Sequence, residues 1–365
     1  MGKELCVFSM QPQECSVMIP QSRPDLYPSD FDYIEQLLRT RYVAGGPLVE
    51  ELETTFCKRI SVRYAIAVAN GTSALHLALL ALQIGQGDEV ILPSYACPAL
   101  LHAVNYTGAL PVLCDIDPDT FNPTARELQH LLTSRTRAII VTHTFGFPAD
   151  LSEIKNFGVP VIEDCAQALG ASFHGRATGS IGEISVFSFY ATKVICSGEG
   201  GMVCTNSKRL ASRVRDLNQS DMRGDYKIRY NYKLSDLAAG LALRQVSRLE
   251  GLITRRKEIA RRYTQEFAPC ENFKLQLPLV NTDPNYYRFV VRTPRARTLI
   301  SKTTSQGIIC DRPIFRPLHA YLRLPVNQFR HTATIWKTGV SVPLYPALTN
   351  VEVEDIVRIM RESAS

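Results

Sequence analysis

The chain has 365 residues, of which 45% are hydrophobic and 21% are charged, and its formal net charge is +6. This composition is typical of a folded globular protein and excludes extensive disorder, while the length suggests about two domains. The mild positive charge suits an anionic small molecule as well as a nucleic acid and does not decide between them. Because no run of five or more basic residues is present, we expect no nucleic-acid partner.

The ten cysteines lie at least eight residues apart, so no CxxC pair or zinc-binding spacing is present. Most of them stand beside apolar residues, which predicts buried free thiols in a reducing cytoplasm and no metal site. The N-terminus lacks a long apolar segment, and the longest apolar stretch, residues 74–84, is too short to span a bilayer. We therefore expect a cytoplasmic protein that does not associate with membranes.

Helical and strand patterns alternate in the first part of the chain. The helical patterns occupy residues 48–60, 72–84, 97–106, 125–132 and 150–157. Short runs rich in valine and isoleucine predict seven strands, at residues 65–69, 89–93, 110–115, 138–142, 159–163, 184–189 and 202–205. Because most of these strands are apolar throughout, they fit a mostly parallel sheet that helices cover on both faces, which is an α/β fold.

The last two of these strands follow each other without a long helix, which predicts at least one antiparallel strand. A long helical region at residues 235–267 precedes a looser stretch, with a strand at 287–292 and a closing helix at 352–361. We predict three parts, which are a mobile N-terminal arm (residues 1–18), a large domain (19–250) and a smaller C-terminal α+β domain (251–365).

Polar side chains follow several of the predicted strands. They lie in residues 70–73, 93–95, 143, 163–164 and 188–193. In an open α/β sheet, ligands bind at the carboxyl ends of the strands. We therefore expect these segments to converge on one site.

Gly71, Thr72 and Ser73 follow a strand and open a helix. Free N–H groups at that helix start, together with two hydroxyls, can bind a phosphate, although serine and threonine are also common as plain N-caps. The chain contains no GxGxxG after its first strand and no GxxxxGK[ST] motif. Neither a dinucleotide fingerprint nor a P-loop therefore explains this segment.

Asp164 and Lys193 carry the remaining chemistry. Asp164 ends an apolar strand, so its carboxylate needs a partner, which is either a structural arginine or a cationic heterocycle such as a protonated pyridine. Lys193 lies between a buried strand and a glycine-rich turn, where desolvation makes a lysine nucleophilic, although an ordinary loop lysine fits too. A phosphate cradle, a buried carboxylate and a desolvated lysine together predict a site for pyridoxal 5'-phosphate (PLP).

The motifs around these residues resemble those of the DegT/DnrJ/StrS family, the PLP-dependent sugar aminotransferases with the aspartate aminotransferase fold (fold type I). The resemblance extends from about residue 19 to residue 360. The matching stretches are NGTSALHL (70–77), GDEVILPS (87–94), IEDCAQALG (162–170), SVFSF (185–189), GEGG (198–201), YNYKLSD (230–236) and PIFRPLH (313–319). Their order and spacing together are highly specific.

The resemblance implies a role for each matching residue. Lys193 matches the lysine that forms the Schiff base, Asp164 the partner of the pyridine nitrogen, and Gln167 a residue beside the O3′ side of the ring. Phosphate contacts are implied for Thr72, Ser73 and Ser188, with Gly71 at the same helix start.

Two further matches concern the partner subunit and the substrate. Asn231 matches an asparagine that reaches the phosphate from the neighbouring subunit, so the resemblance implies a homodimer with shared active sites. His319 lies in a motif that lines the substrate side in relatives. His76 also lies in a matching stretch, but we interpret it as a packed helix residue.

The chain departs from the family pattern at two positions. Many relatives place an aromatic residue over the cofactor ring where this chain has Cys97, with Tyr95 two residues earlier. Either Tyr95 takes over the stacking or the ring face is covered in another way. The common Asn-Tyr-Arg also becomes Asn-Tyr-Lys, with Lys233 in place of the forked guanidinium.

The resemblance implies an aminotransferase that moves an amino group from L-glutamate to a keto group of a nucleotide-linked sugar or a similar polyol. Two alternatives stay open: a PLP-dependent dehydratase or aromatising enzyme of the same family, and a non-catalytic regulatory relative. Some members carry histidine in place of the lysine and dehydrate their substrates, so Lys193 favours the aminotransferase.

Overall fold

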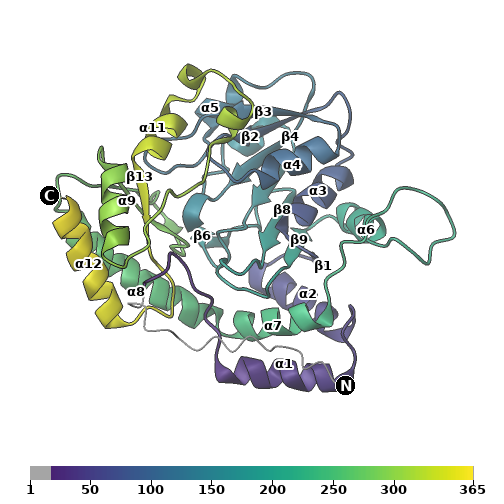
Figure 1. Cartoon of the computed structure of the whole chain (residues 1–365). Helices are drawn as coiled ribbons and strands as arrows, with labels where there is room; N and C mark the ends of the chain where they lie inside the picture. Colours follow the sequence, from purple (N-terminus) through teal and green to yellow (C-terminus); the bar gives the residue numbers. More distant parts are fainter. Residues whose placement is uncertain (1–17, 365) are drawn as a thin grey trace, which may run out of the picture.

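The computed structural model describes residues 18–364, and its centre is a seven-stranded sheet (Figure 1). The strands are β1 (Tyr64–Val68), β2 (Glu89–Pro93), β3 (Leu110–Cys114), β4 (Thr136–Thr142), β5 (Val161–Asp164), β8 (Ile184–Ser188) and β9 (Gly201–Thr205). Their order across the sheet is β1-β9-β8-β5-β4-β2-β3, and β9 runs antiparallel to both of its neighbours while the other pairs are parallel. The predicted mostly parallel sheet with at least one antiparallel strand is confirmed, and the structure places that strand, β9, next to the edge.

Both faces of this sheet are apolar and covered by helices. In β1, Ala65 and Ala67 belong to one core cluster, whereas Ile66 and Val68 belong to the cluster on the other face. The covering helices are α2 (Pro47–Ile60) and α7 (Asp236–Ser247) on the first face, and α3 (Gly71–Ala81), α4 (Ala99–Tyr106) and α6 (Lys208–Leu217) on the second. Burial on both faces explains why the strands are apolar runs and do not alternate with polar residues.

A smaller sheet lies in the C-terminal part of the chain. Its antiparallel strands are β10 (Lys274–Leu275), β12 (Phe289–Arg292) and β13 (Gly339–Val342). The helices that share its core are α8 (Leu249–Phe267), α9 (Ala296–Ser305) and α12 (Asn350–Ala364). The domain boundary that the sequence places at residue 250 falls at the start of α8 and stays a prediction.

The other elements are short and connect these layers. A third sheet is formed by β6 (Ser172–Phe173), β7 (Arg176–Ala177) and β11 (Thr282–Asp283). The short helices are α5 (Ala125–Gln129), α10 (Leu318–Tyr321), α11 (Arg330–Thr338) and the 3-10 turns η1 (Thr144–Gly146), η2 (Ile154–Phe157) and η3 (Val326–Gln328).

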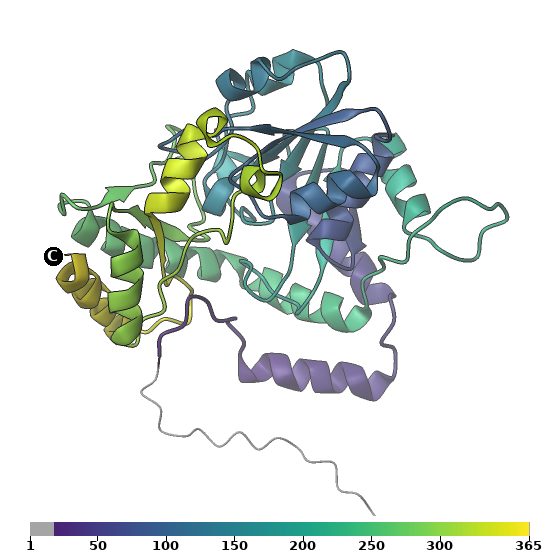
Figure 2. The ribbon, with the colours of Figure 1, turned by 45° about the horizontal axis from the view of Figure 1, so that its top comes forward.

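Several elements differ from the sequence prediction, among them α9, α10, α11 and β13, which the sequence did not predict. The helix expected at residues 150–157 is reduced to the 3-10 turn η2, and neither α6 nor the N-terminal helix α1 (Pro28–Thr40) was predicted. Figure 2 shows α1 alongside α7, and a segment between α6 and α7 that extends away from the rest of the chain. Apart from Met18, the predicted N-terminal arm lies outside the described residues.

None of the helices within residues 18–364 combines the length and the apolar character that crossing a membrane requires.

Candidate active site

A cavity of about 800 Å³ opens at the carboxyl ends of the central strands. The segments that follow β1, β2, β4, β5 and β8 all contribute to its wall, as the sequence predicted. The C-terminal part of the chain adds the opposite wall, which includes Tyr287, Arg288 and residues 313–316. The lining contains Lys193, Gly71, Thr72, Ser73, Tyr95, Asp164, Gln167 and Ser188.

The N-terminus of α3 forms one end of the cavity. Asn70 is the N-cap, and its side-chain oxygen accepts the N–H of Ser73 at 2.8 Å. The N–H groups of Gly71 and Thr72 have no acceptor among the described residues. A Cβ atom on Gly71 would lie 2.9 Å from Cβ of Ser188, so only glycine lets the helix start approach the end of β8 so closely. The segment therefore offers unpaired donors in a narrow cradle, which fits a phosphate.

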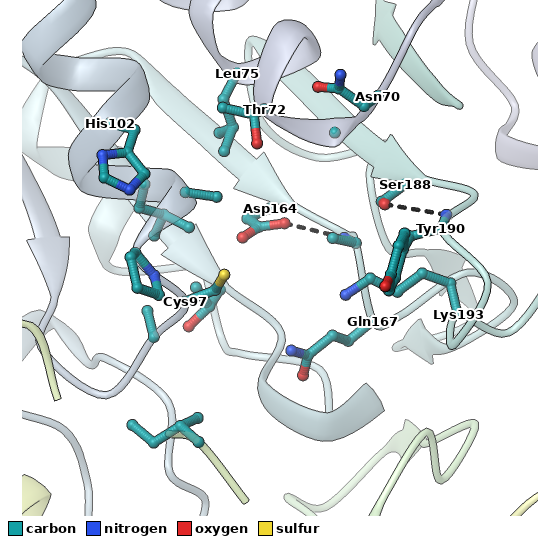
Figure 3. A pocket seen from close by; sticks show the side chains of 18 of the residues that line it. Asn70, Thr72, Leu75, Cys97, His102, Asp164, Gln167, Ser188, Tyr190 and Lys193 are labelled. Carbon is teal, nitrogen blue, oxygen red and sulfur yellow. Dashed lines mark hydrogen bonds between the residues drawn. The ribbon is translucent and has the colours of Figure 1, made fainter. Parts of the chain in front are cut away.

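Asp164 is buried at the end of β5, with 9% of the residue exposed. One carboxylate oxygen accepts the N–H of Ala166 at 3.0 Å, and no arginine pairs with this side chain in residues 18–364. Burial raises the pKa of Asp164, while the Ala166 N–H and the positive charge of Lys193 act in the opposite direction. Figure 3 shows the carboxylate at the cavity wall, where a cationic ligand group could complete its pairing.

Lys193 lies on the loop after β8, and its backbone N–H donates to the carbonyl of Tyr190 at 2.8 Å. The side chain is partly buried, and Figure 3 shows its amine directed toward the space between Asp164 and Gln167. The Gln167 side-chain oxygen accepts the N–H of Phe145 at 2.8 Å, which leaves its nitrogen without an acceptor among the described residues. A nucleophile, a carboxylate and an amide donor thus face the same space.

Tyr287 contributes a group that the sequence reasoning missed. Its ring is buried, and the Lys193 amine lies 5.2 Å from the ring centroid. The Tyr287 hydroxyl lies 3.4 Å from the hydroxyl of Thr192. Burial alone would raise the pKa of Tyr287. The positive charges of Lys193 and Arg288 outweigh this effect and lower the pKa to about 8. The sequence offered one signal for this residue, because Tyr287 and Arg288 are polar residues directly before the apolar strand β12.

Tyr95 and Cys97 occupy different environments in the loop after β2. Tyr95 is 1% exposed and packs edge-on against Phe121 and Phe145, with ring centroids 6.0 and 5.9 Å apart. Cys97 is exposed and lines the cavity, and Figure 3 shows its sulfur on the side of Asp164. This packing favours the alternative in which the ring face is covered by something other than Tyr95.

The remaining predicted residues lie outside the cavity wall. Asn231 is exposed, although its neighbour Tyr232 lines the cavity. His319 is buried, its Nδ1 lies 2.7 Å from Oγ of Ser94, and its ring stacks on Phe329. The structure therefore places His319 as an anchor between two loops and does not bring it to the cavity.

His76 is buried in α3, as expected, with its Nδ1 3.3 Å from the hydroxyl of Tyr232. It also contributes to the cavity wall.

His143, Glu163 and Cys165 place their ligand atoms within 4.8 Å of one another, as a metal site does. However, Nε2 of His143 bonds to Glu163 at 3.0 Å, and its Nδ1 accepts the N–H of Ala149 at 2.9 Å. Both nitrogens are thus already engaged, and burial raises the pKa of the Cys165 thiol well above its ordinary value. The cluster is better described as a hydrogen-bond network beneath Asp164.

Comparisons with known proteins test the family resemblance and the fold. Residues 24–361 match the model of the DegT/DnrJ/EryC1/StrS aminotransferase family. The chain is 32% identical to a GDP-perosamine synthase of Escherichia coli O157:H7 (94% of this chain, 98% of the relative) and 33% identical to a GDP-perosamine synthase of Caulobacter vibrioides (93% and 96%). The structure of S. venezuelae DesV in complex with a ketimine intermediate is 30% identical, with a TM-score of 0.88 over 92% of this chain and 94% of that one. The fold class and the resemblance stated from the motifs are confirmed.

Proposed function

This chain belongs to the DegT/DnrJ/EryC1/StrS aminotransferase family, and we propose that it uses PLP to move an amino group from L-glutamate to the keto group of a nucleotide-linked sugar. The observation that carries this proposal is that the Lys193 amine and the Asp164 carboxylate face one cavity beside the unpaired N–H groups of α3. The names of the two GDP-perosamine synthases support a nucleotide-linked acceptor. The net charge of +6 is compatible with a substrate that carries phosphates.

The phosphate of the cofactor would bind at the start of α3. The N–H groups of Gly71 and Thr72 are free to donate, and the hydroxyls of Thr72, Ser73 and Ser188 lie in the same cradle. The positive end of the helix dipole adds to these hydrogen bonds.

Asp164 would hold a proton at the pyridine nitrogen. Burial raises the pKa of its carboxyl group, so an adjacent cation would stabilise the ionised form, and a protonated ring nitrogen is such a cation. Gln167 would donate from its side-chain nitrogen to the ring oxygen, because its own oxygen is engaged by Phe145.

When bound, PLP supplies an aldehyde that condenses with amines and a ring that accepts the electron pair of a substrate carbon. Lys193 would hold the cofactor through its amine and, once released, move a proton at the substrate carbon. The loop bond from Lys193 to Tyr190 and the ring of Tyr287 orient this side chain toward the cavity.

We further propose a homodimer in which each cavity takes Asn231 from the partner chain. Asn231 is exposed and lies outside the cavity of its own chain. The segment between α6 and α7 that carries it extends from the body and exposes Met222, Tyr226 and Ile228 by 92, 98 and 71%. Exposed apolar side chains on such a segment are typical of a surface that another subunit covers.

Subunit mixing tests this arrangement. We expect Asn231→Asp and Lys193→Ala each to abolish turnover, because one repels the phosphate and the other removes the nucleophile. An equal mixture of the two variants should regain roughly a quarter of the wild-type activity, since half of the dimers are mixed and each carries one complete site. Absence of any recovery after exchange of subunits, verified by mass measurement, contradicts the shared site.

We propose a cytoplasmic location because the described cysteine side chains are free thiols. All eight cysteines in the described part of the chain are free, and five of them are buried, which suits a reducing compartment.

The decisive experiment on function uses the visible absorption of the bound cofactor and nitrogen-15 glutamate. The purified protein should be yellow and should pass the label to a nucleotide-linked keto sugar. Lys193→Ala should lose both properties, whereas Lys208→Ala, an exposed lysine at the start of α6, should keep them. Turnover without transfer of nitrogen would instead support the dehydratase alternative, and failure to bind PLP the regulatory one.

A further inference from the structure

Arg288 lines the cavity, and its guanidinium has no carboxylate partner among residues 18–364. It immediately precedes β12, where its backbone N–H donates to the carbonyl of Phe145 at 3.4 Å, and its side chain donates to Oγ of Ser341 at 3.2 Å. Asp164 and Glu199 are the carboxylates in the cavity lining, and neither forms an ion pair with Arg288. A partly buried cation in this situation is stabilised by an anionic ligand.

The position of Arg288 is fixed relative to the reactive amine through Tyr287. The Lys193 amine lies 5.2 Å from the centroid of the Tyr287 ring, and the Arg288 guanidinium carbon lies 5.4 Å from it. The two cationic groups are therefore no more than 10.6 Å apart, which is the sum of these distances. A small ligand bound at Lys193 therefore lies in the neighbourhood of the Arg288 guanidinium.

The surroundings of Tyr287 add further positive charge. Arg256 is buried behind it and donates to the carbonyls of Tyr287 and Leu344 at 3.3 and 3.1 Å, again without a carboxylate partner in residues 18–364. Burial lowers the pKa of Arg256 to about 10, yet the group keeps its proton at neutral pH. This wall of the cavity is therefore electropositive on two sides of Tyr287.

The two proposed substrates place their anionic groups at different distances from the reacting carbon. In an amino-acid donor, a carboxylate is bonded directly to the carbon that carries the amino group. In a nucleotide-linked sugar, the phosphates lie several bonds from a ring ketone. We propose that Arg288 binds the carboxylate next to the amino group of the donor, an inference that rests on the function proposed above.

The test measures binding of glutarate, an unreactive dicarboxylate, to the PLP-loaded protein by calorimetry. Arg288→Gln should weaken glutarate binding by roughly 10- to 100-fold, because a charge-assisted hydrogen-bond pair is lost. Arg288→Lys, which keeps the charge but loses the planar fork, should fall between this variant and the wild type. The matched control is Arg312→Gln, a partly buried arginine that donates to the carbonyls of Lys337 and Gly339 outside the cavity wall, and it should bind glutarate like the wild type.

A second measurement separates the two half-reactions. In the first half-reaction, glutamate removes the yellow colour of the PLP-loaded protein, and Arg288→Gln should need at least about tenfold more glutamate for this change. In the reverse of the second half-reaction, the concentration of amino sugar nucleotide that is needed should change less than about threefold. Unchanged glutarate binding, or equal loss in both half-reactions, overturns the inference. If Arg288→Gln fails to fold, the glutarate affinity of Arg288→Lys decides. If glutarate depends on Arg288 but no nucleotide-linked sugar accepts nitrogen, the inference stands and the proposed acceptor is wrong.

Discussion

The buried carboxylate of Glu163 should be among the most sensitive positions of this fold. One of its oxygens accepts from Nε2 of His143 at 3.0 Å and from the N–H of Gly179 at 2.8 Å. The other accepts from the N–H groups of Ile181 and Gly182 at 2.7 and 2.6 Å. The residue is fully buried, so water cannot replace any of these four hydrogen bonds. The carboxylate thereby ties the loop before β8 to the strand that ends at Asp164.

The substitution Glu163→Gln keeps the shape but converts one acceptor oxygen into an NH₂ donor. Whichever way the amide turns, its nitrogen faces two donors, and both lose their acceptor. His143 cannot relieve the conflict by changing tautomer, because its Nδ1 already accepts the N–H of Ala149. Each buried donor left unpaired costs about 1–3 kcal/mol, so we expect a loss of roughly 2–6 kcal/mol in the free energy of unfolding.

The same network predicts how this loss depends on pH. Burial would raise the pKa of Glu163, but the hydrogen bond from His143 and the N–H groups of Gly182 and Gly179 lower it below its ordinary value of 4.5. A carboxylate whose pKa is lower in the folded state stabilises the fold above its unfolded pKa, and this stabilisation disappears as the pH falls through the folded pKa. The difference between wild type and Glu163→Gln should therefore shrink below about pH 4.5.

Urea unfolding at pH 7 and at pH 4 measures both effects. The matched control is Glu183→Gln, an exposed carboxylate that accepts one N–H, from Val161, and it should cost less than about 1 kcal/mol. A loss below about 1 kcal/mol for Glu163→Gln at pH 7 would refute the hydrogen-bond account. A loss that stays constant down to pH 4 would refute the pKa argument alone.

Three further predictions concern the cavity and the N-terminal helix. Gly71→Ala brings a Cβ atom to 2.9 Å from Ser188, so PLP titration should show cofactor binding weakened roughly 5- to 100-fold. Cys97 is exposed in the cavity, so peptide mapping after iodoacetamide treatment should find it alkylated at least about tenfold more slowly once PLP is bound. Asp30 is buried and paired with Arg248 at 2.7 Å, and although burial opposes it, this bond lowers its pKa to about 2. Asp30→Asn should therefore destabilise the protein by about 3 kcal/mol at pH 7 in urea unfolding, and progressively less as the pH falls toward 2.

The strands could be predicted because burial on both faces leaves a continuous apolar signal. The run at residues 89–93 coincides with β2, in which all five residues are buried. In α1 the signal is weak, because Asp30 is the residue buried there while Phe31 and Leu38 remain 60 and 51% exposed. Its position depends on the ion pairs of Asp30 with a helix more than 200 residues away, which no local pattern reports.

The site was predictable where a functional residue follows a strand of the central sheet. Asp164 ends β5 and Lys193 lies on the loop after β8, so the sheet topology brings them to one edge. Tyr287 and Arg288 reach the same cavity from the C-terminal part of the chain, and only tertiary packing shows this. The loop after β2 is irregular, so side-chain alternation could not predict that Tyr95 is packed among aromatic rings while Cys97 is exposed in the cavity.

The cavity collects polar groups that the chain itself leaves unpaired. The N–H groups of Gly71 and Thr72, one oxygen of Asp164 and the nitrogen of Gln167 have no partner among residues 18–364, and the guanidinium of Arg288 has no carboxylate partner there. Buried polar groups are normally satisfied, so the convergence of donors, an acceptor and a cation fits the proposed cofactor, with its phosphate, ring nitrogen and ring oxygen, and the carboxylate of the proposed donor. The same groups that lower the stability of the empty protein would then provide the affinity for cofactor and donor. A ligand present at about a hundred times its Kd would raise the free energy of unfolding by about 2.7 kcal/mol.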